Sequence, residues 1–215
     1  MTQPELVFLK LGGSLITNKD VPLTPRPGTI KRISREISLA CMNDPNIRIL
    51  IGHGSGSFGH AIAAQYQTQL GEQDHNYWQG FVEVWRAARE LNQIMIKALS
   101  NEDLPVLSFP PSAGVIANDR NLQSWGIRPI QTALAHGIIP VVAGDVIFDE
   151  AIGGTIFSTE ELFHYLAEQL HPTRILLAGL DQGVYEDPEH PEKIIQHITP
   201  AQLNEVEPSL KGSSS

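Results

Sequence analysis

The stretch Gly52-His-Gly-Ser-Gly-Ser-Phe-Gly-His60 stands between a short apolar run and the start of a helical segment. The run Arg48-Ile-Leu-Ile51 has the length and composition of a buried strand, and Ala61-Ile-Ala-Ala-Gln-Tyr66 those of a helix start. Glycines let the backbone adopt positive φ and bring its N–H groups against a ligand, and a helix start adds the positive end of a dipole. A strand, a glycine loop and a helix in this order predict an anion site, most often for a phosphate.

Length, charge and cysteine content limit the class of protein that carries this loop. With 215 residues, 41% of them hydrophobic, and no apolar run long enough to cross a bilayer, the chain predicts one soluble globular unit. Lys and Arg number 15 against 24 for Asp and Glu, and the net charge of -9 argues against binding to nucleic acid or to an anionic membrane. Cys41 is the single cysteine and the N-terminus lacks a signal-peptide pattern, so we expect a cytoplasmic protein.

A second glycine turn, Gly12-Gly13-Ser14, follows another expected strand over residues 5–11. Lys10 therefore lies at the carboxyl end of that strand. Ligands bind at this edge of an open α/β sheet, although a lysine there can also extend into solvent. A second lysine, Lys19, stands in the polar, proline-rich loop that follows, where it could equally be a solvated charge.

A third polar residue beside glycine is Asp145, which with Gly144 follows an expected strand over 138–143. The remaining expected elements are helices over 29–41, 79–100 and 162–170, strands over 105–109, 174–178 and 194–198, a hairpin of 146–148 with 155–157, and capped helix starts at Ser158 and Thr199. Because strands alternate with helices, the sequence predicts an α/β fold with a mainly parallel sheet covered on both faces.

The spacing of Gly54, Gly56 and Gly59 is also that of a Gly-x-Gly-x-x-Gly dinucleotide loop, so an NAD-dependent oxidoreductase has to be weighed. That fold needs a second strand ending in an acidic residue roughly 20 positions further on. No apolar strand precedes Glu72 or Asp74, which disfavours this alternative. The Gly-Lys-Ser/Thr continuation of a Walker loop is missing as well.

Two glycine loops, two lysines and an aspartate at neighbouring strand ends favour phosphoryl transfer between two phosphate-bearing ligands. The transition state of this reaction spreads charge over the transferred oxygens, so positioning and cationic stabilisation dominate catalysis. If the acceptor is itself a phosphate, its oxygen is already ionised near neutral pH and needs no strong base. A histidine that donates to the acceptor fits this role, and His60 is better placed for it than His53, which precedes the glycines.

Five segments stand out together: Lys10-Leu-Gly-Gly-Ser14, Lys19, His53-Gly-Ser-Gly-Ser-Phe-Gly-His60, Gly80-Phe-Val-Glu-Val-Trp-Arg-Ala87 and Gly144-Asp145. In this spacing the chain resembles the isopentenyl phosphate kinases of the amino acid kinase superfamily over nearly its whole length. The resemblance implies an αβα sandwich, usually a homodimer. It also implies transfer of the γ-phosphoryl group of MgATP to isopentenyl phosphate, a step of isoprenoid biosynthesis.

The resemblance also implies a role for individual residues. Lys10 and Lys19 would hold the transferring phosphoryl group, with Asp145 orienting them, and Mg²⁺ would be held mainly by the nucleotide phosphates rather than by the protein. The positions implied at ATP are Lys10, Gly12, Gly13, Ser14, Gly56, Gly179, Asp181 and Gly183. The positions implied at the substrate are Ser55, Gly59, His60, Phe81, Val84 and Gly154. The helix stripe of Phe81 and Val84 could also be ordinary core.

The chain departs from the family pattern at three points. Ser55 replaces a usual glycine, and Ser158-Thr-Glu-Glu161 replaces a Ser-Gly-Asp-Asp-like segment. The sequence also stops at Ser215, before the family's nucleotide-binding lysine, so we expect a single amino acid kinase domain over 1–215 without that segment. Fosfomycin kinase is the nearest competitor, because it would use the same lysines and histidine on a phosphonate. A non-catalytic ligand-sensing domain is disfavoured, because it needs no phosphoryl-stabilising lysines.

Overall fold

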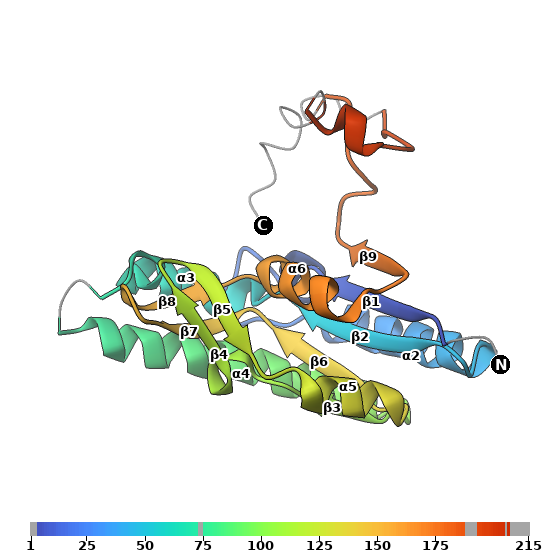
Figure 1. The fold of residues 1–215 in the computed structure, drawn as a ribbon, viewed down its shortest axis with the longest axis horizontal. Helices are drawn as coiled ribbons and strands as arrows, with labels where there is room; N and C mark the ends of the chain where they lie inside the picture. Colours follow the sequence, from blue (N-terminus) through green and yellow to red (C-terminus); the bar gives the residue numbers. More distant parts are fainter. Residues whose placement is uncertain (1–3, 73–74, 188–192, 205, 207–215) are drawn as a thin grey trace. The chain divides into compact units, whose positions relative to one another are not determined.

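The structure is a computed structural model and describes residues 4–72, 75–187, 193–204 and 206. It divides into two units, Met1–Ala178 and Gly179–Ser215 (Figure 1). Within the described ranges, no helix has both the length and the apolar character that crossing a membrane requires.

The first unit is built on a sheet of five parallel strands in the order β3-β6-β2-β1-β9. The strands are β1 (Leu6–Leu11), β2 (Arg48–His53), β3 (Val106–Ser108), β6 (Ile139–Ala143) and β9 (Arg174–Ala178). Each coincides with a short apolar run in the sequence, as expected for strands that are covered on both faces. The predicted parallel sheet is therefore confirmed.

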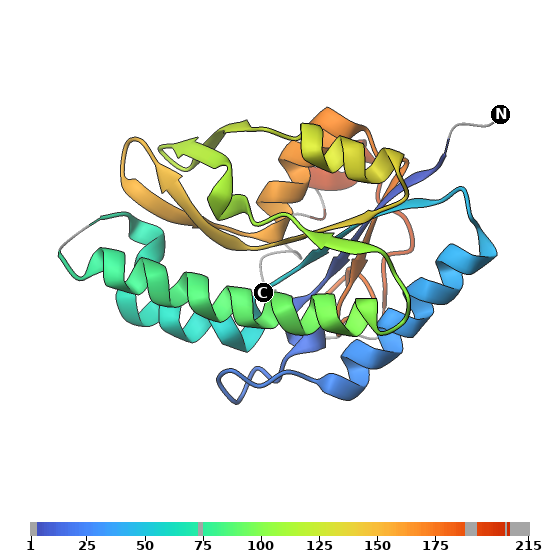
Figure 2. The ribbon, with the colours of Figure 1, turned by 90° about the horizontal axis from the view of Figure 1, so that it is seen from below.

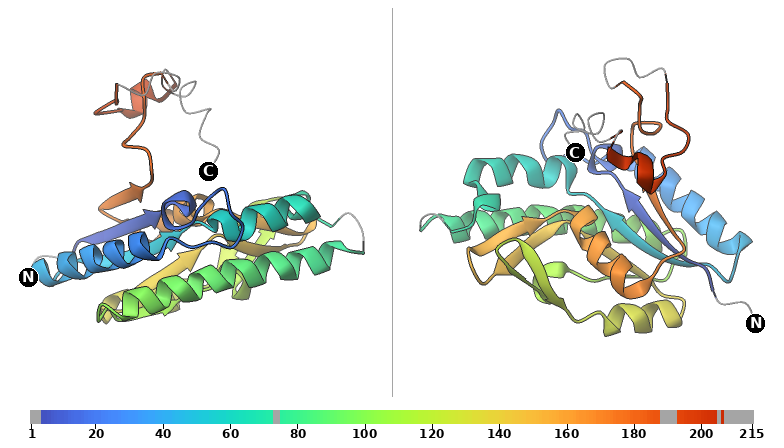
Figure 3. Two further views of the ribbon diagram at one scale, coloured as in Figure 1. Left: turned by 180° about the vertical axis from the view of Figure 1, so that it is seen from behind. Right: turned by 45° about the horizontal axis from the view of Figure 1, so that its top comes forward.

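Helices cover both faces of this sheet (Figure 2, Figure 3). The helices are α1 (Gly13–Ile16), α2 (Pro27–Asn43), α3 (Gly56–Tyr66), α4 (Tyr77–Ser100), α5 (Arg128–Ala135) and α6 (Thr159–Leu170), with short 3₁₀ turns η1 (Thr68–Leu70) and η2 (Pro111–Ala113). One core packs the sheet against α2 and α4, and the other packs it against α5 and α6. Ile49 and Ile51 of β2 belong to the first core and Leu50 to the second, because successive strand residues point to opposite faces. The layers form the predicted αβα sandwich.

A second sheet has four strands in the order β5-β4-β7-β8. Its strands are β4 (Val115–Asn118), β5 (Asn121–Trp125), β7 (Asp145–Asp149) and β8 (Gly153–Phe157). The antiparallel pair β7–β8 is the hairpin that the sequence predicts. The partners of this hairpin were not predicted: β4 pairs parallel with β7 and antiparallel with β5.

One carboxylate fastens the turns of this second sheet. Asp149 is 3% exposed and accepts backbone N–H bonds from Asp119, Ala151 and Ile152 at one oxygen and from Arg120 at the other, over 2.8 to 3.1 Å. Burial raises the pKa of Asp149, but these four bonds outweigh burial and leave the pKa lowered. Asp119 and Arg120 both have positive φ, 48° and 58°, so Asp149 stabilises a left-handed turn that contains no glycine.

The second unit contains one antiparallel bridge, Tyr185 with Ile194, and the short η3 (Pro200–Gln202) among its described residues. The predicted strand over 194–198 is wrong, because only its first residue pairs. The predicted capped start is confirmed, since the backbone N–H of Thr199 donates to the Gln202 side chain at 3.0 Å.

Candidate active site

Four parallel strands end in one line, and a glycine follows each. The last residues, which are register partners across the sheet, are Ala143, His53, Leu11 and Ala178. The residues that follow them are Gly144, Gly54, Gly12 and Gly179. Carboxyl ends of parallel strands form the ligand-binding edge of an open α/β sheet. The structure therefore brings the predicted glycine loops to one edge.

The two glycine loops touch each other. A side-chain carbon added to Gly13 would lie 2.5 Å from the backbone nitrogen of Gly56, and one added to Gly54 would lie 3.0 Å from the nitrogen of Gly13. Gly56 has a φ of +48°, in the left-handed region. Side chains at these positions would force the loops apart. The loops and the start of α3 thus present closely spaced backbone N–H groups, an arrangement suited to phosphate oxygens.

Thr17, which the sequence analysis did not select as a site residue, connects the two glycine loops by hydrogen bonds. It is fully buried, and its hydroxyl donates to the carbonyl of Gly13 at 2.7 Å and accepts from the N–H of Ser57 at 3.0 Å. Ser57 in turn accepts from the backbone N–H of Thr24 at 3.3 Å and Leu23 at 3.2 Å. The loop that carries Lys19 is therefore fastened to the start of α3.

Lys10 contacts a carboxylate that the sequence analysis did not assign. Its ammonium group forms an ion pair with Glu160, in the first turn of α6, and the two side chains are 13% and 48% exposed. Glu160 is thus the partner of Lys10 in the structure, and the role of Asp145 in orienting the lysines stays a prediction. The sequence carries no signal for this pair, because the helix dipole already favours a glutamate in the first turn of α6.

Asp145 has other partners. It is 6% exposed, and its two oxygens accept backbone N–H bonds from Ser112 at 3.1 Å and Val146 at 2.9 Å. Burial raises the pKa of this carboxyl, and its hydrogen bonds and the charge of Arg89 oppose the rise. Asp145 thus anchors β7 to η2 and lines a small pocket beside α4, together with Asn92 and other residues.

His60 and Lys19 come close enough to affect each other. His60 is exposed in the second turn of α3, and its pKa is lowered by partial burial and by the charge of Lys19. A neutral imidazole still donates one N–H. The charge of Lys19 thus acts on a potential hydrogen-bond donor from another loop, and the roles of Lys19 and His60 at a ligand stay predictions.

Ser55 and Gly59 lie one helical turn apart at the start of α3, just before His60. A side-chain carbon at Gly59 would be 2.5 Å from the hydroxyl of Ser55, so this turn has room for only one side chain. Gly154, on β8, lies elsewhere: an added carbon there would be 2.7 Å from the ring of Phe81 and 2.9 Å from the hydroxyl of Tyr77. Gly154 thus packs against α4.

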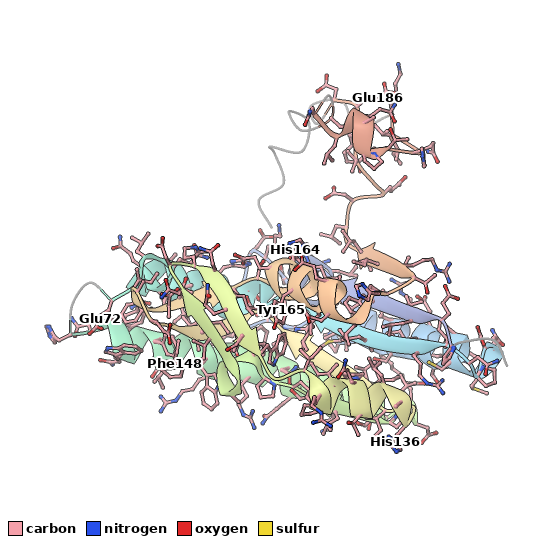
Figure 4. All side chains as sticks on the ribbon, in the orientation of Figure 1. Glu72, His136, Phe148, His164, Tyr165 and Glu186 are labelled. Atoms are coloured by element: carbon pink, nitrogen blue, oxygen red, sulfur yellow. The ribbon has the colours of Figure 1, made fainter. Side chains whose placement is uncertain are left out.

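An apolar cluster continues from this turn of α3. Ala63, three residues after His60, is buried with residues of α4 and β7, and the members of the cluster are Ala63, Tyr77, Phe81, Val84 and Val146. Phe148, labelled in Figure 4, is 48% exposed and stacks on Trp78 with ring centroids 6.1 Å apart at the border of this cluster. The predicted Phe81 and Val84 are therefore next to the helix that carries His60, although both are also core residues.

The remaining predicted positions belong to the second unit. Gly179, Asp181 and Gly183 follow β9 there, and their role at a nucleotide stays a prediction. Within the described ranges, no three His, Cys, Asp or Glu side chains are grouped so as to hold a metal ion.

The comparisons with known proteins agree on one family. Residues 5–214 match the model of the amino acid kinase family. The isopentenyl phosphate kinase of Methanocaldococcus jannaschii is 32% identical over 98% of this chain and 81% of that protein. That of Methanothermobacter thermautotrophicus is also 32% identical, over 97% of this chain and 79% of that protein.

The solved structures give the same result. One of isopentenyl phosphate kinase superposes with a TM-score of 0.82 and 28% identity, over 96% of this chain and 86% of that one. A substrate complex of isopentenyl phosphate kinase superposes with a TM-score of 0.78 and 25% identity, over 94% and 84% of the two chains. An aspartate kinase from Synechocystis, at 15% identity, shares the fold with a TM-score of 0.71.

Proposed function

The chain belongs to the amino acid kinase family and is a kinase, and we propose that it transfers the γ-phosphoryl group of ATP to isopentenyl phosphate. The products are isopentenyl diphosphate and ADP. One observation carries the substrate: the helix that starts in the glycine loop and bears His60 continues into an apolar cluster at Ala63. An anion site that leads into an apolar site fits a phosphate with a five-carbon tail.

The donor side of the site is the contact between the two glycine loops. Backbone N–H groups at Gly12, Gly13 and Gly56 bind the ATP phosphates, and Lys10 stabilises the charge on the transferring group. Glu160 holds the Lys10 ammonium in place, which supports a fixed position for this charge before ATP binds. Ser14 follows the first loop, and the resemblance also implies a nucleotide role for Gly179, Asp181 and Gly183 of the second unit. Mg²⁺ would be held mainly by the nucleotide phosphates and would neutralise part of their charge.

The acceptor side is the start of α3. The backbone at Ser55 and Gly59 binds the phosphate of isopentenyl phosphate, and His60 donates a hydrogen bond to it. The lowered pKa of His60 supports a neutral donor rather than a proton acceptor, in keeping with an acceptor oxygen that is already ionised. Lys19, whose charge acts on His60, lies on this side and follows the phosphoryl group as it moves.

The tail of the substrate packs in the apolar cluster. Phe81 and Val84 share one face of α4 and are 5% and 3% exposed, with Val146 of the hairpin opposite them. Gly154 brings β8 against Phe81, so the hairpin closes the tail site. Each CH₂ group buried there contributes about 0.8 kcal/mol, which favours a prenyl phosphate over a short phosphonate by a few kcal/mol.

Steady-state kinetics with MgATP and isopentenyl phosphate, read as ADP release and as isopentenyl diphosphate by mass spectrometry, test the proposal. Fosfomycin is the matched competitor, because it offers a phosphonate without the tail. A higher kcat/KM for fosfomycin than for isopentenyl phosphate would refute the proposed substrate assignment. Absence of turnover with both compounds would refute the proposed reaction. Lys10→Ala and Lys19→Ala should each lower kcat, because each removes a preorganised charge that lowers the activation free energy by a few kcal/mol. The free energy of unfolding should stay unchanged in both variants. The homodimer implied by the resemblance is tested by light scattering.

A further inference from the structure

A buried chain of hydrogen bonds reaches the glycine loop from three elements. The hydroxyl of Ser108, on β3, donates to Oδ1 of Asn92, on α4, at 2.8 Å. Nδ2 of Asn92 lies 3.0 Å from Nε2 of His53, and Nδ1 of His53 lies 3.1 Å from the carbonyl oxygen of Gly54. His53 is fully buried and Asn92 is 9% exposed. The proposed reaction assigns no role to these hydrogen-bonded side chains.

Only one arrangement of protons satisfies these contacts with a neutral ring. The carbonyl of Gly54 can only accept, so Nδ1 of His53 carries the proton. Nε2 is then an acceptor, and Asn92 must present its NH₂ group to it. The carbonyl of Asn92 consequently faces Ser108, whose hydroxyl donates. Burial lowers the pKa of His53 to about 4, against a smaller effect of the Gly54 bond, so the doubly protonated ring is disfavoured.

This bond fixes a peptide of the glycine loop. The carbonyl of Gly54 and the N–H of Ser55 belong to one trans peptide group and therefore point in opposite directions. Gly54 has no side chain that could restrain this peptide. The N–H of Gly54 donates to the carbonyl of Leu11 and the carbonyl of Ser55 accepts from the N–H of Phe58, both at 3.0 Å, but neither bond involves the peptide group between Gly54 and Ser55. Among the described residues, no protein acceptor takes the N–H of Ser55.

We propose that His53 is a positioning residue whose Nδ1–H holds the Gly54 carbonyl inward and so turns the Ser55 N–H toward the anion in the loop. Asn92 and Ser108 hold the ring in the required tautomer. This inference rests on the proposed function only in naming the anion as the phosphate of isopentenyl phosphate. The orientation of the peptide does not depend on it.

Two substitutions of His53 separate positioning from packing. His53→Asn places an amide N–H near the Nδ1 position and keeps the donor to Gly54, whereas His53→Gln places its amide near Nε2 and keeps only the contact to Asn92. Both lose the ring, so thermal unfolding should change similarly in the two. Loss of one buried hydrogen bond to the loop predicts a KM for isopentenyl phosphate that is about tenfold higher in His53→Gln. His53→Asn should stay within about threefold of the wild type, and the KM for ATP should hardly change in either.

Nuclear magnetic resonance tests the orientation without relying on the substrate. Long-range ¹H–¹⁵N spectra of the wild type should show His53 protonated at Nδ1 and not at Nε2. The backbone amide of Ser55 should shift when inorganic phosphate is added to the wild type or His53→Asn, and much less in His53→Gln. A proton on Nε2, or a Ser55 amide that ignores phosphate in the wild type, overturns the proposal.

The two proposals fail in different ways. If the wild type turns over isopentenyl phosphate but His53→Asn and His53→Gln have equal KM values and equal Ser55 responses, His53 is a packing residue and the proposed function stands. If the wild type does not turn over isopentenyl phosphate but the Ser55 amide follows the predicted pattern with inorganic phosphate, the positioning role stands and the proposed function is wrong.

Discussion

Replacing Glu160 by glutamine should slow the reaction without unfolding the protein, because Glu160 is the carboxylate that holds Lys10. Lys10 is 13% exposed and Glu160 48% exposed. Two unit charges about 4 Å apart attract by about 4 kcal/mol at an effective dielectric constant of 20. Solvent at the half-exposed Glu160 screens this attraction toward the 1 kcal/mol or less of surface pairs, so we expect about 1 to 2 kcal/mol. This corresponds to a roughly five- to thirtyfold lower kcat.

Glu161→Gln is the matched control. The same chemical change is made one residue further along α6, and glutamine can keep the capping box with Ser158. The ion pair that it removes, with Arg120 at 3.4 Å, joins side chains that are 42% and 43% exposed, and such pairs contribute little. The kcat of Glu161→Gln should therefore stay within about twofold of the wild type.

The assay is steady-state kinetics with saturating isopentenyl phosphate and varied MgATP, together with the melting temperature of each variant. Glu160→Gln should lower kcat while the KM for ATP stays equal or falls, since the ATP phosphates no longer compete with a carboxylate for Lys10. A wild-type kcat in Glu160→Gln, or the same loss of kcat in both variants, would refute the reasoning.

Four further predictions follow from the site and its surroundings. His60→Gln, which keeps a hydrogen-bond donor, should retain more kcat than His60→Ala; equal losses would mean a structural histidine. Phe81→Ala and Val84→Ala should raise the relative kcat/KM for geranyl phosphate over isopentenyl phosphate, and an unchanged chain-length preference would leave both as core residues only. The pKa of His53 falls from the ordinary 6.5 to about 4 on folding, so the unfolded chain takes up a proton first as the pH drops. The free energy of unfolding should thus decrease by about 3 kcal/mol between about pH 6.5 and pH 4, and urea titrations of His53→Asn should lack this decrease. Asp149→Ala leaves four backbone N–H groups without their acceptor and should cost about 3 kcal/mol or more in the same titrations, whereas a cost below about 1 kcal/mol would mean that water replaces the carboxylate.

The main sheet and most of its covering helices could be predicted because their signals are local, whereas α5 was not predicted. Short apolar runs bounded by glycine mark buried strands, and α2, α4 and α6 carry apolar residues at helical spacing. The pair β4–β5 had no such signal, since Asn118 and Asn121 are of a type depleted in strands. The turn between these strands contains no glycine, because Asp149 stabilises it from a distant part of the chain. The apolar pair at Ile194 gave a false strand signal for lack of a partner strand among the described residues.

The site was predictable where one residue follows a strand, and not where two distant segments meet. Lys10 and His60 were singled out because they lie next to glycine loops in the sequence, and their roles stay predictions. The partner of Lys10 is 150 positions away, and only the packing of α6 over the sheet brings Glu160 to it. That packing needs Gly52, where an added side-chain carbon would collide with Phe163 of α6. A single sequence does not reveal such a pair.

The contact between Gly13 and Gly56 also has a mechanical consequence. The two loops meet backbone to backbone, and the Thr17 hydroxyl forms a hydrogen bond to each of them. They cannot move against each other without breaking these hydrogen bonds. In the proposed site both phosphates bind at these two loops, so the fold would set the distance between donor and acceptor before either ligand binds. Substrates of different shape must then be accommodated by the surrounding elements, above all by the β7–β8 hairpin and the side chains of α4. We therefore expect changes of substrate preference, in evolution or in engineering, to arise from substitutions in the hairpin and α4, with the two glycine loops unchanged.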